Sequence, residues 1–255
     1  MMVSTIYAGG SWFTVDGEGY RKSGAIRSVA GQPVPDFTRL AYGLVLDSDA
    51  TVSDDGAVVG DPTEAALVVL AAKLSVDADE TRRSYPRLAA VPFDSEYKFM
   101  ATFHRVQVDG ADYLIELVKG GPDVVLARCT QAGGPLSGTQ VPIEQERPGI
   151  EAANRQMGEK GLRVLAFAAR VLDDADERAI AQDPMTFTQG LSFVGMAGII
   201  DPLRTEAKGA VQTALDAGID VRMITGDHAV TAHAIGEALG LGAGALSGTE
   251  LQAMS

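Results

Sequence analysis

The sequence has very little cysteine, with Cys129 as its single thiol among 255 residues. One thiol cannot form an internal disulfide, which excludes a small disulfide-stapled scaffold and favours a reducing compartment. Long apolar runs are also missing, because the longest, Leu191–Ile200, is about half of the roughly 20 residues that a membrane-spanning helix needs. The first residues carry no basic segment followed by an apolar signal core. The chain is therefore expected to be soluble as it stands.

Positive charge is scarce as well. Lys and Arg total 21 against 34 Asp and Glu, for a formal net charge of -13. This balance argues against a nucleic-acid binder or a module for anionic membrane surfaces, so we expect no nucleic-acid partner. The three histidines, His104, His228 and His233, lack the clustered spacing of a zinc site, and no metal site is predicted.

Apolar residues, in contrast, are plentiful. They make up 46% of the chain, which excludes a disordered or collagen-like protein and is enough for one large domain or two ordinary ones. Residues 1–60 mix short apolar pieces with turn residues, a pattern typical of short strands. Asp61, Pro62 and Glu64 then form a capping signal, with Glu64 in the reciprocal position, for a helix that runs to about Leu74.

The middle of the chain predicts an antiparallel sheet with helices. Two strand-like runs between Phe99 and Val118 flank Asp109–Gly110, the dipeptide that favours a tight hairpin turn. After Lys119–Gly120–Gly121, Pro122 opens a short helix. Residues 144–160 indicate a longer helix, and residues 162–171 a buried strand.

Near residue 200 the pattern changes to alternating α/β order. Residues 205–217 and 231–239 are predicted helices, and residues 219–224 a short apolar strand between them. With Leu191–Ile200 as a preceding strand this segment has the length of a βαβ unit. Periodicity alone would therefore begin a second domain near Leu191.

Two turns have a chemistry suited to anions. Thr225, Gly226 and Asp227 stand between the predicted strand and helix, where backbone amides and a hydroxyl can hold a phosphoryl group; an ordinary turn capped by Asp227 is equally compatible. Lys119 and Gly120 place a cation and an accessible backbone at a strand end before a helix N-terminus. A solvated lysine beside a turn is the alternative there.

Three further residues have two interpretations each. Phe93 and Lys98 are spaced so that one can stack a base while the other meets its phosphates, or they simply end a strand, with the phenylalanine packed in the core. Arg163 points to the opposite side of its strand from Leu162 and Val164, either toward a ligand or toward solvent.

Six motifs, in this order and spacing, resemble the cytoplasmic region of type II P-type cation-transporting ATPases. The resemblance covers nearly the whole chain. The motifs are Gly60-Asp61-Pro62-Thr63-Glu64-Ala65-Ala66-Leu67, Phe93-Asp94-Ser95-Glu96-Tyr97-Lys98-Phe99-Met100, Lys119-Gly120-Gly121-Pro122-Asp123, Gly161-Leu162-Arg163-Val164-Leu165, Asp201-Pro202-Leu203-Arg204 and Met223-Ile224-Thr225-Gly226-Asp227-His228.

The resemblance implies a mixed α/β fold in two parts. Residues 1–200 are expected to form a nucleotide-binding (N) domain, an antiparallel sheet flanked by helices. Residues 201–255 are expected to be part of a Rossmann-like phosphorylation (P) domain of the haloacid dehalogenase class. Asp201 and Arg204 resemble the hinge between the two domains, which moves the boundary from Leu191 to about residue 200 and returns the preceding strand to the first sheet.

The resemblance also implies an ATP site in the N domain, with Mg²⁺ arriving with the nucleotide. Phe93 would stack the adenine, Glu64 would lie near its amino group, and Lys98, Lys119 and Arg163 would meet the phosphates, roles that suit an aromatic face, an acceptor and cations. Thr225, Gly226 and Asp227 would steady the transferred phosphoryl group. Neighbouring motif positions complete the expected nucleotide site: Met100, Gly120 and Leu165.

Other family features are missing from this sequence. It has no Asp-Lys-Thr-Gly-Thr phosphorylation motif and no magnesium-binding Gly-Asp-Gly-Val-Asn-Asp segment. The expectation is an excised piece of a membrane pump that binds ATP on the cytoplasmic face but is catalytically incomplete alone. Its partners would be the transmembrane, actuator and remaining phosphorylation domains. The alternatives are a separate phosphohydrolase of the dehalogenase class with a large cap, or a regulatory binding module without nucleotide.

Overall fold

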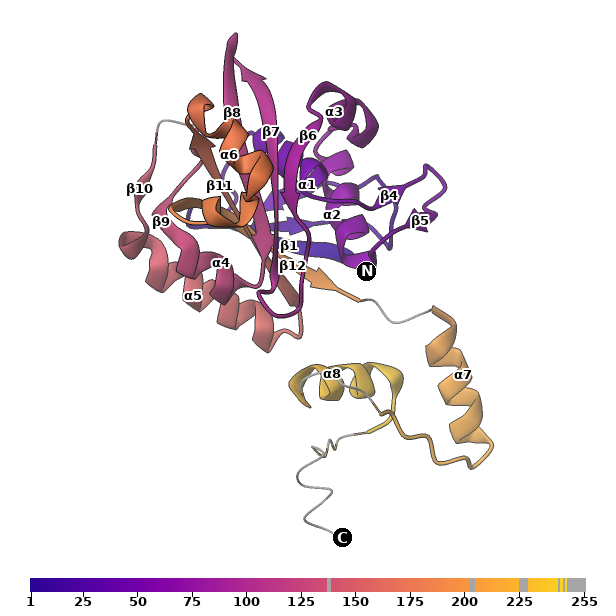
Figure 1. Ribbon diagram of the computed structural model, residues 1–255. Coiled ribbons are helices and arrows are strands. Elements are labelled where there is room, and N and C mark those ends of the chain that lie inside the picture. Colours follow the sequence, from indigo (N-terminus) through magenta and orange to yellow (C-terminus); the bar gives the residue numbers. More distant parts are fainter. Residues whose placement is uncertain (137–138, 202–204, 225–228, 243, 245, 247–255) are drawn as a thin grey trace.

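A large sheet runs through the main body of the protein in the computed structural model, which describes residues 1–136, 139–201, 205–224, 229–242, 244 and 246 (Figure 1). Ten strands join it, in the order β3-β2-β1-β12-β11-β8-β7-β6, with β9 beside β12 and β10 beside β9. Neighbours on the main path are antiparallel, and β9 pairs with β12 in parallel. β4 and β5 form a separate small sheet. The strands are β1 (Met2–Ala8), β2 (Ser11–Val15), β3 (Ile26–Ser28), β4 (Thr51–Val52), β5 (Val58–Val59), β6 (Arg87–Val91), β7 (Phe99–Val108), β8 (Ala111–Gly120), β9 (Cys129–Ala132), β10 (Val141–Pro142), β11 (Arg163–Leu172) and β12 (Leu191–Ile200).

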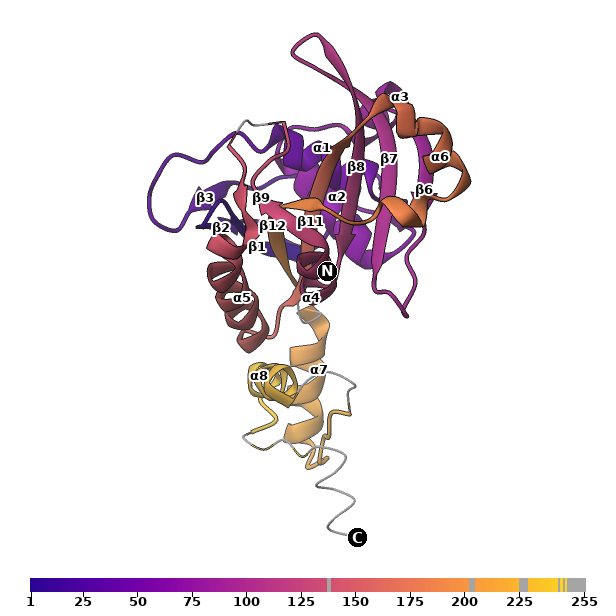
Figure 2. The ribbon, with the colours of Figure 1, turned by 60° about the vertical axis from the view of Figure 1, so that its left-hand side comes forward.

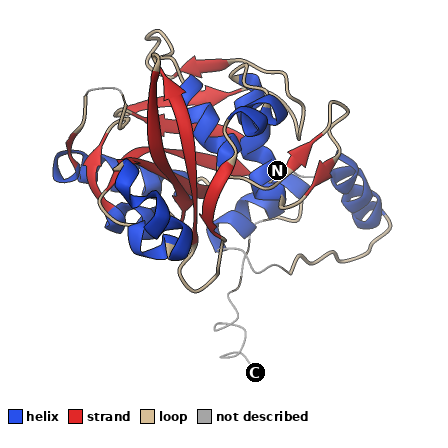
Figure 3. Cartoon of the chain, turned by 45° about the horizontal axis from the view of Figure 1, so that its top comes forward, coloured by secondary structure: helices blue, strands red, loops and turns tan. Residues whose placement is uncertain are grey.

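Helices cover both faces of the sheet, which makes a three-layer body (Figure 3). α1 and α2 pack their apolar side chains on one face, and α4, α5 and α6 pack theirs on the other. α7 and α8 lie away from the sheet, at the bottom of Figures 1 and 2. The predicted antiparallel sheet with flanking helices is thus confirmed. The helices are α1 (Thr38–Leu46), α2 (Pro62–Lys73), α3 (Ala78–Ser84), α4 (Pro122–Arg128), α5 (Ile143–Glu159), α6 (Glu177–Gln182), α7 (Thr205–Asp216) and α8 (Ala229–Leu239), with short 3₁₀ turns at Asp174–Asp176 and Pro184–Phe187.

The β7–β8 hairpin follows from its turn residues. Asp109 and Gly110 have φ of 52° and 82°, the left-handed values that a two-residue turn with the strand twist requires. Val108 and Ala111 face each other directly across this turn. The register then continues to Phe99 opposite Gly120, which places the residues after the hairpin beside those before it.

The start of α2 confirms one half of its capping signal. The Asp61 carboxylate accepts hydrogen bonds from the backbone N–H groups of Thr63 and Glu64, and Pro62 occupies the first helical position. The reciprocal hydrogen bond, in which the Glu64 carboxylate would accept from the backbone N–H of Asp61, was predicted wrongly. Its carboxylate accepts instead from the N–H groups of Asp49 and Ala50, at 2.8 and 3.1 Å, so it ties α2 to a preceding loop.

Leu191–Ile200 belongs to the large sheet, where β12 lies between β1 and β11. The predicted strand at residues 219–224 is wrong, since this segment has no strand structure and Ile224 is 98% exposed. An apolar strand needs neighbouring strands to bury it, and within the described ranges none lies beside this segment. Cys129 is buried at the start of β9, and burial raises the pKa of its thiol to about 12.

Candidate functional site

Lys119 is the centre of a buried polar cluster. Its side chain lies at the end of β8, only 6% of the residue is exposed, and its Nζ is 2.9 Å from Glu64 Oε1. The same ammonium donates to the backbone carbonyl of Asp47 and lies 3.1 Å from the Met100 sulfur. The interpretation of Lys119 as a solvated lysine is therefore wrong. Three of the predicted site residues, Glu64, Met100 and Lys119, come together.

Four elements assemble this cluster. Met100 on β7 and Lys119 on β8 are direct partners in the antiparallel register, so their side chains lie on the same face of the sheet. The first turn of α2 brings Glu64 onto that face, and the end of α1 brings Asp47. Lys119, near the end of β8, thus contacts Asp47 at the end of α1, although the two residues are far apart in the sequence.

The carboxyl group of Asp47 has an unusual environment. It is buried, with Oδ1 4.0 Å from Lys119 Nζ, and neither of its oxygens has a hydrogen-bond partner among the described residues. Burial raises the pKa of Asp47 to about 8, because the loss of hydration outweighs the attraction of Lys119. Sequence reasoning missed this residue, since no motif marks it.

Arg163 lies beside the cluster. Its guanidinium donates to Thr63 Oγ1 at 3.0 Å, and Thr63 precedes Glu64 on α2. Leu165 is two residues further along β11 on the same face and packs against the core beneath α1 and α2. These two predicted site residues therefore share the sheet face of Lys119.

Phe93 and Lys98 lie on the β6–β7 connection, residues 92–98. Phe93 is 62% exposed, an unusual position for a large aromatic side chain. Lys98 is held by its backbone, since its N–H donates to the Asp94 carbonyl and its carbonyl accepts from Gly121 N–H at 3.0 Å. This places the backbone of Lys98 beside Gly120. Within the described ranges, no hydrogen bond, ion pair or ring contact joins Phe93 to the Lys119 cluster.

Gly120 is required by a close backbone approach. A Cβ at this position would lie 2.6 Å from the Lys98 carbonyl oxygen and 2.7 Å from Phe99 Cβ. Gly120→Ala is expected to destabilise the protein by about 1–3 kcal/mol, because the β6–β7 connection must shift. Urea unfolding measures this loss. Gly158→Ala in α5 is the matched control, because its Cβ meets nothing within 4 Å, and that variant should be no less stable than the wild type. Equal stability of the two variants would contradict the close approach.

The other predicted residues are less informative. Asp201 follows β12, is exposed, and lies 3.6 Å from the Met1 amine. Arg204 and the turn Thr225, Gly226 and Asp227 lie outside the described residues. Among the residues that the structure does describe, no group of three or more His, Cys, Asp or Glu side chains is placed to hold a metal ion.

Comparison with known families decides the relationship. The family described as "P-type ATPase, cytoplasmic domain N" matches residues 37–206, about two thirds of the chain. The chain belongs to the P-type cation ATPase family. The matched segment contains the Lys119 cluster, Arg163 and the β6–β7 connection, and the resemblance predicted from the six motifs is confirmed.

Curated relatives within the P-type ATPases cover more of the chain. A cation-transporting ATPase of Synechocystis is 38% identical over 95% of this chain, which corresponds to 27% of that relative. A calcium-transporting ATPase of Listeria monocytogenes is 36% identical over 85% of the chain and 24% of its own length. The human calcium-transporting ATPase type 2C member 1 is 35% identical over 94% of the chain and 25% of its own length. The chain thus spans about a quarter of these P-type ATPases. No helix in its described portion combines the length and apolarity that crossing a bilayer demands.

Proposed function

We propose that this P-type ATPase chain binds ATP on the sheet face that carries Glu64, Lys119 and Arg163. The observation that carries the proposal is the 2.9 Å ion pair of Glu64 and Lys119, assembled beside Arg163 from segments far apart in the chain. An acceptor and cations gathered at one place suit a purine with a polyphosphate. The match to the N domain and the names of the relatives support the same ligand.

Glu64 keeps room for one more hydrogen bond. Its Oε2 accepts from the N–H groups of Asp49 and Ala50, and its Oε1 accepts from Lys119. An ionised carboxylate has about four acceptor positions, so one remains on Oε1 for the adenine amino group. Lys119 is occupied by protein acceptors, and we assign it to holding Glu64 in place. Lys98 and Arg163 would bind the phosphates.

Phe93 supplies the surface for the adenine ring, together with Leu165, while Gly120 lets the β6–β7 connection approach β8, and the buried Met100 packs against Lys119 beneath the site. Mg²⁺ would enter with the phosphates of ATP. The bound ion would neutralise phosphate charge. This chain's own residues would bind and orient the nucleotide.

The larger proposal concerns the whole pump. Residues 1–200 form the N domain and residues 201–255 part of a P domain of the haloacid dehalogenase class, with Asp201 and Arg204 at the hinge. ATP bound here would phosphorylate an aspartate that this sequence does not contain, with Thr225, Gly226 and Asp227 steadying the phosphoryl group. The partners are the transmembrane, actuator and phosphorylation domains of a cation pump, and the chain would act at the cytoplasmic face of the membrane.

Phe93→Ala is expected to weaken ATP binding five- to hundredfold, as the loss of one base–aromatic stacking contact of about 1–3 kcal/mol predicts. The fold should persist, because Phe93 is exposed and its removal leaves no cavity. Isothermal titration calorimetry with ATP measures the change. Phe93→Trp retains a flat aromatic face and should bind, and Leu88→Ala, another exposed apolar position, should bind like the wild type.

Undiminished ATP affinity in Phe93→Ala would remove the stacking role. Absence of any heat of ATP binding to the wild-type chain would go further, since it would favour a binding module without nucleotide.

A further inference from the structure

Arg82 holds the loop of residues 47–50, which joins α1 to β4. Its half-buried side chain comes from α3. The guanidinium donates to the backbone carbonyls of Ser48 and Ala50, both at 2.9 Å, and to the Val45 carbonyl at 3.3 Å. A planar group with several donors can bridge carbonyls in this way, so one side chain fixes the end of α1 and the loop together.

One peptide group of this loop is bonded at both of its ends. Its carbonyl belongs to Ser48 and accepts from Arg82, and its N–H belongs to Asp49 and donates to Glu64 Oε2 at 2.8 Å. A carbonyl that accepts from a cation polarises its peptide group, which makes the N–H of that group a stronger donor. A single peptide group therefore connects the Arg82 guanidinium to the Glu64 carboxylate.

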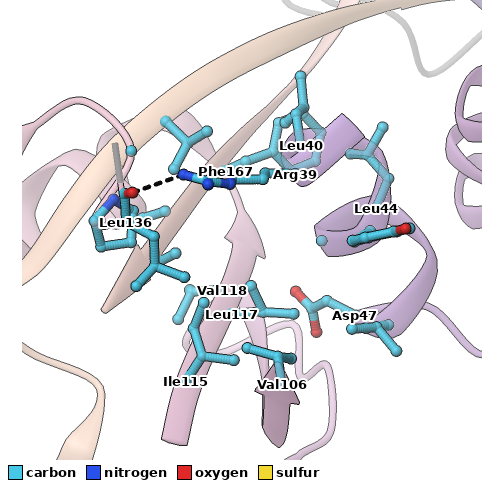
Figure 4. Close-up of a pocket in the computed structure, with 18 of the residues that line it drawn as sticks. Arg39, Leu40, Leu44, Asp47, Val106, Ile115, Leu117, Val118, Leu136 and Phe167 are labelled. Carbon is cyan, nitrogen blue, oxygen red and sulfur yellow. Dashed lines mark hydrogen bonds between the residues drawn. The ribbon is translucent and has the colours of Figure 1, made fainter. Parts of the chain in front are cut away.

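Toward α1 the loop has mainly apolar neighbours. Asp47 lies at the edge of an apolar cavity of about 110 Å³ between α1 and the sheet, which is lined by residues such as Leu44 and Val106 (Figure 4). Contacts between apolar groups are non-directional, so they do not determine where a peptide N–H points. The direction of the Asp49 N–H thus depends on the bond that Arg82 makes to the carbonyl of the same peptide group.

Glu64 is within reach of a ligand, because 14% of its side chain is exposed. Its Oε2 is held by the N–H groups of Asp49 and Ala50, and its Oε1 by Lys119. These bonds fix the plane of the carboxylate and with it the direction of the remaining acceptor position on Oε1. The 47–50 loop is therefore part of what orients Glu64.

We propose that Arg82 is a positioning residue for selection of the purine base, an inference that rests on the proposed ATP site. Through the Ser48–Asp49 peptide group it holds Glu64 so that Oε1 meets position 6 of the purine. An ionised carboxylate only accepts hydrogen bonds, so it binds the 6-amino group of adenine and repels the 6-oxo group of hypoxanthine or guanine. Without the Arg82 guanidinium, the peptide group and Glu64 would turn, and the two kinds of base would bind more nearly alike.

ATP and inosine triphosphate test this inference, because the inosine compound carries an oxo group where ATP has its 6-amino group. Calorimetric titration of the full chain should show a preference of wild type for ATP of roughly ten- to hundredfold, as one charged hydrogen bond predicts. Arg82→Lys keeps the positive charge but loses the planar fork, and it should reduce this preference about tenfold. Arg83→Lys, at the next and exposed position of α3, is the control and should keep the wild-type preference.

The ratio of the two affinities separates positioning from a general effect on the fold, since both nucleotides are titrated into the same sample. In a Glu64→Gln background, Arg82→Lys should change the ratio no further, because the residue through which Arg82 acts has lost its charge. Without nucleotide, the amide proton signal of Asp49 should move upfield in Arg82→Lys as its hydrogen bond to Glu64 weakens. Arg83→Lys should leave that signal in place.

An unchanged ATP preference in Arg82→Lys would overturn the positioning role of Arg82 while ATP binding itself stands. An equal loss of preference in Arg83→Lys, or a wild type that binds the two nucleotides equally well, would overturn it too. If neither nucleotide binds to the wild-type chain, the proposed ATP site is wrong and the inference about Arg82 is wrong with it.

Discussion

Replacing Lys119 by methionine is expected to lower the free energy of unfolding by about 3–5 kcal/mol at pH 7, the usual effect of removing one partner from a buried ion pair. Methionine keeps the apolar stem but removes the ammonium. The Glu64 carboxylate would then lose its counter-ion 2.9 Å away, and the Asp47 carbonyl would lose its donor. Both groups lie between α2, α1 and the sheet, where water replaces the lost contacts poorly.

Urea unfolding measures this loss, with the fluorescence of Trp12, the single tryptophan, as the signal. Lys119→Met combined with Glu64→Gln should recover much of the stability, because the second change removes the unpaired charge. Lys208→Met on the exposed side of α7 is the control and should change stability by less than about 0.5 kcal/mol. A similarly small loss for Lys119→Met would show that the ion pair does not stabilise this fold.

The Lys119 experiment also decides how ATP-binding variants are interpreted. Lys119 orients Glu64, so a loss of ATP binding in Lys119→Met would follow from a displaced Glu64 as readily as from a lost phosphate contact. Phe93 variants do not have this ambiguity, because the Phe93 side chain is exposed and away from the buried ion pair. Stability and binding must therefore be measured on the same samples.

Local signals predicted much of the fold. Asp61 with Pro62 set the start of α2, and Asp109–Gly110 set the β7–β8 turn, since caps and tight turns depend on residues a few positions apart. α1 was missed because Phe37, at its N-cap position, makes no side-chain capping bond. Residues 219–224 were overpredicted because apolar content alone does not supply a neighbouring strand.

The candidate site was predicted in part. The motif resemblance named Glu64, Met100 and Lys119 together, but neither it nor local pattern revealed that Lys119 would be buried. Its hydrogen-bond partner Asp47 is 72 positions away in the chain, and only the packing of α1 on the sheet brings the two together. Long-range contacts of this kind determine burial and therefore pKa. The buried position of the Asp47 carboxyl group could be found only in the structure.

Glu116 is a second carboxyl group whose pKa is raised by burial, and it lies on the other face of the sheet. It is fully buried on β8 opposite Arg170 on β11, with a carboxylate–guanidinium distance of 3.3 Å. Neither carboxyl oxygen makes a hydrogen bond within the described part of the chain. Burial outweighs the attraction of Arg170 and raises the pKa of Glu116 from 4.5 to about 8. The folded protein therefore holds this proton where the unfolded chain has released it.

The raised pKa of Glu116 makes the stability of the fold depend on pH. Between pH 4.5 and about 8 the folded state binds more protons at Glu116 than the unfolded state does, so its contribution to stability falls as pH rises. Below this window both states are protonated, and above it both are ionised. Glu116→Gln cannot ionise and should gain on the order of 4 kcal/mol relative to the wild type across the window.

Urea unfolding at intervals of one pH unit between about pH 5 and about pH 9 tests this, because linkage predicts a difference between wild type and Glu116→Gln that widens up to about pH 8 and is constant above it. Asp47 titrates in the same direction, so wild-type stability should fall for two reasons, and Asp47→Asn should remove the second. The two side chains lie on opposite faces of the sheet, but the Asp47 carboxylate repels that of Glu116 and raises its pKa, so the effects of the two variants should not simply add. Glu151→Gln on the exposed face of α5 should track the wild type at every pH. Parallel curves for wild type and Glu116→Gln would mean that Arg170 keeps the buried carboxylate ionised throughout, and that the ion pair, not desolvation, governs this strand pair.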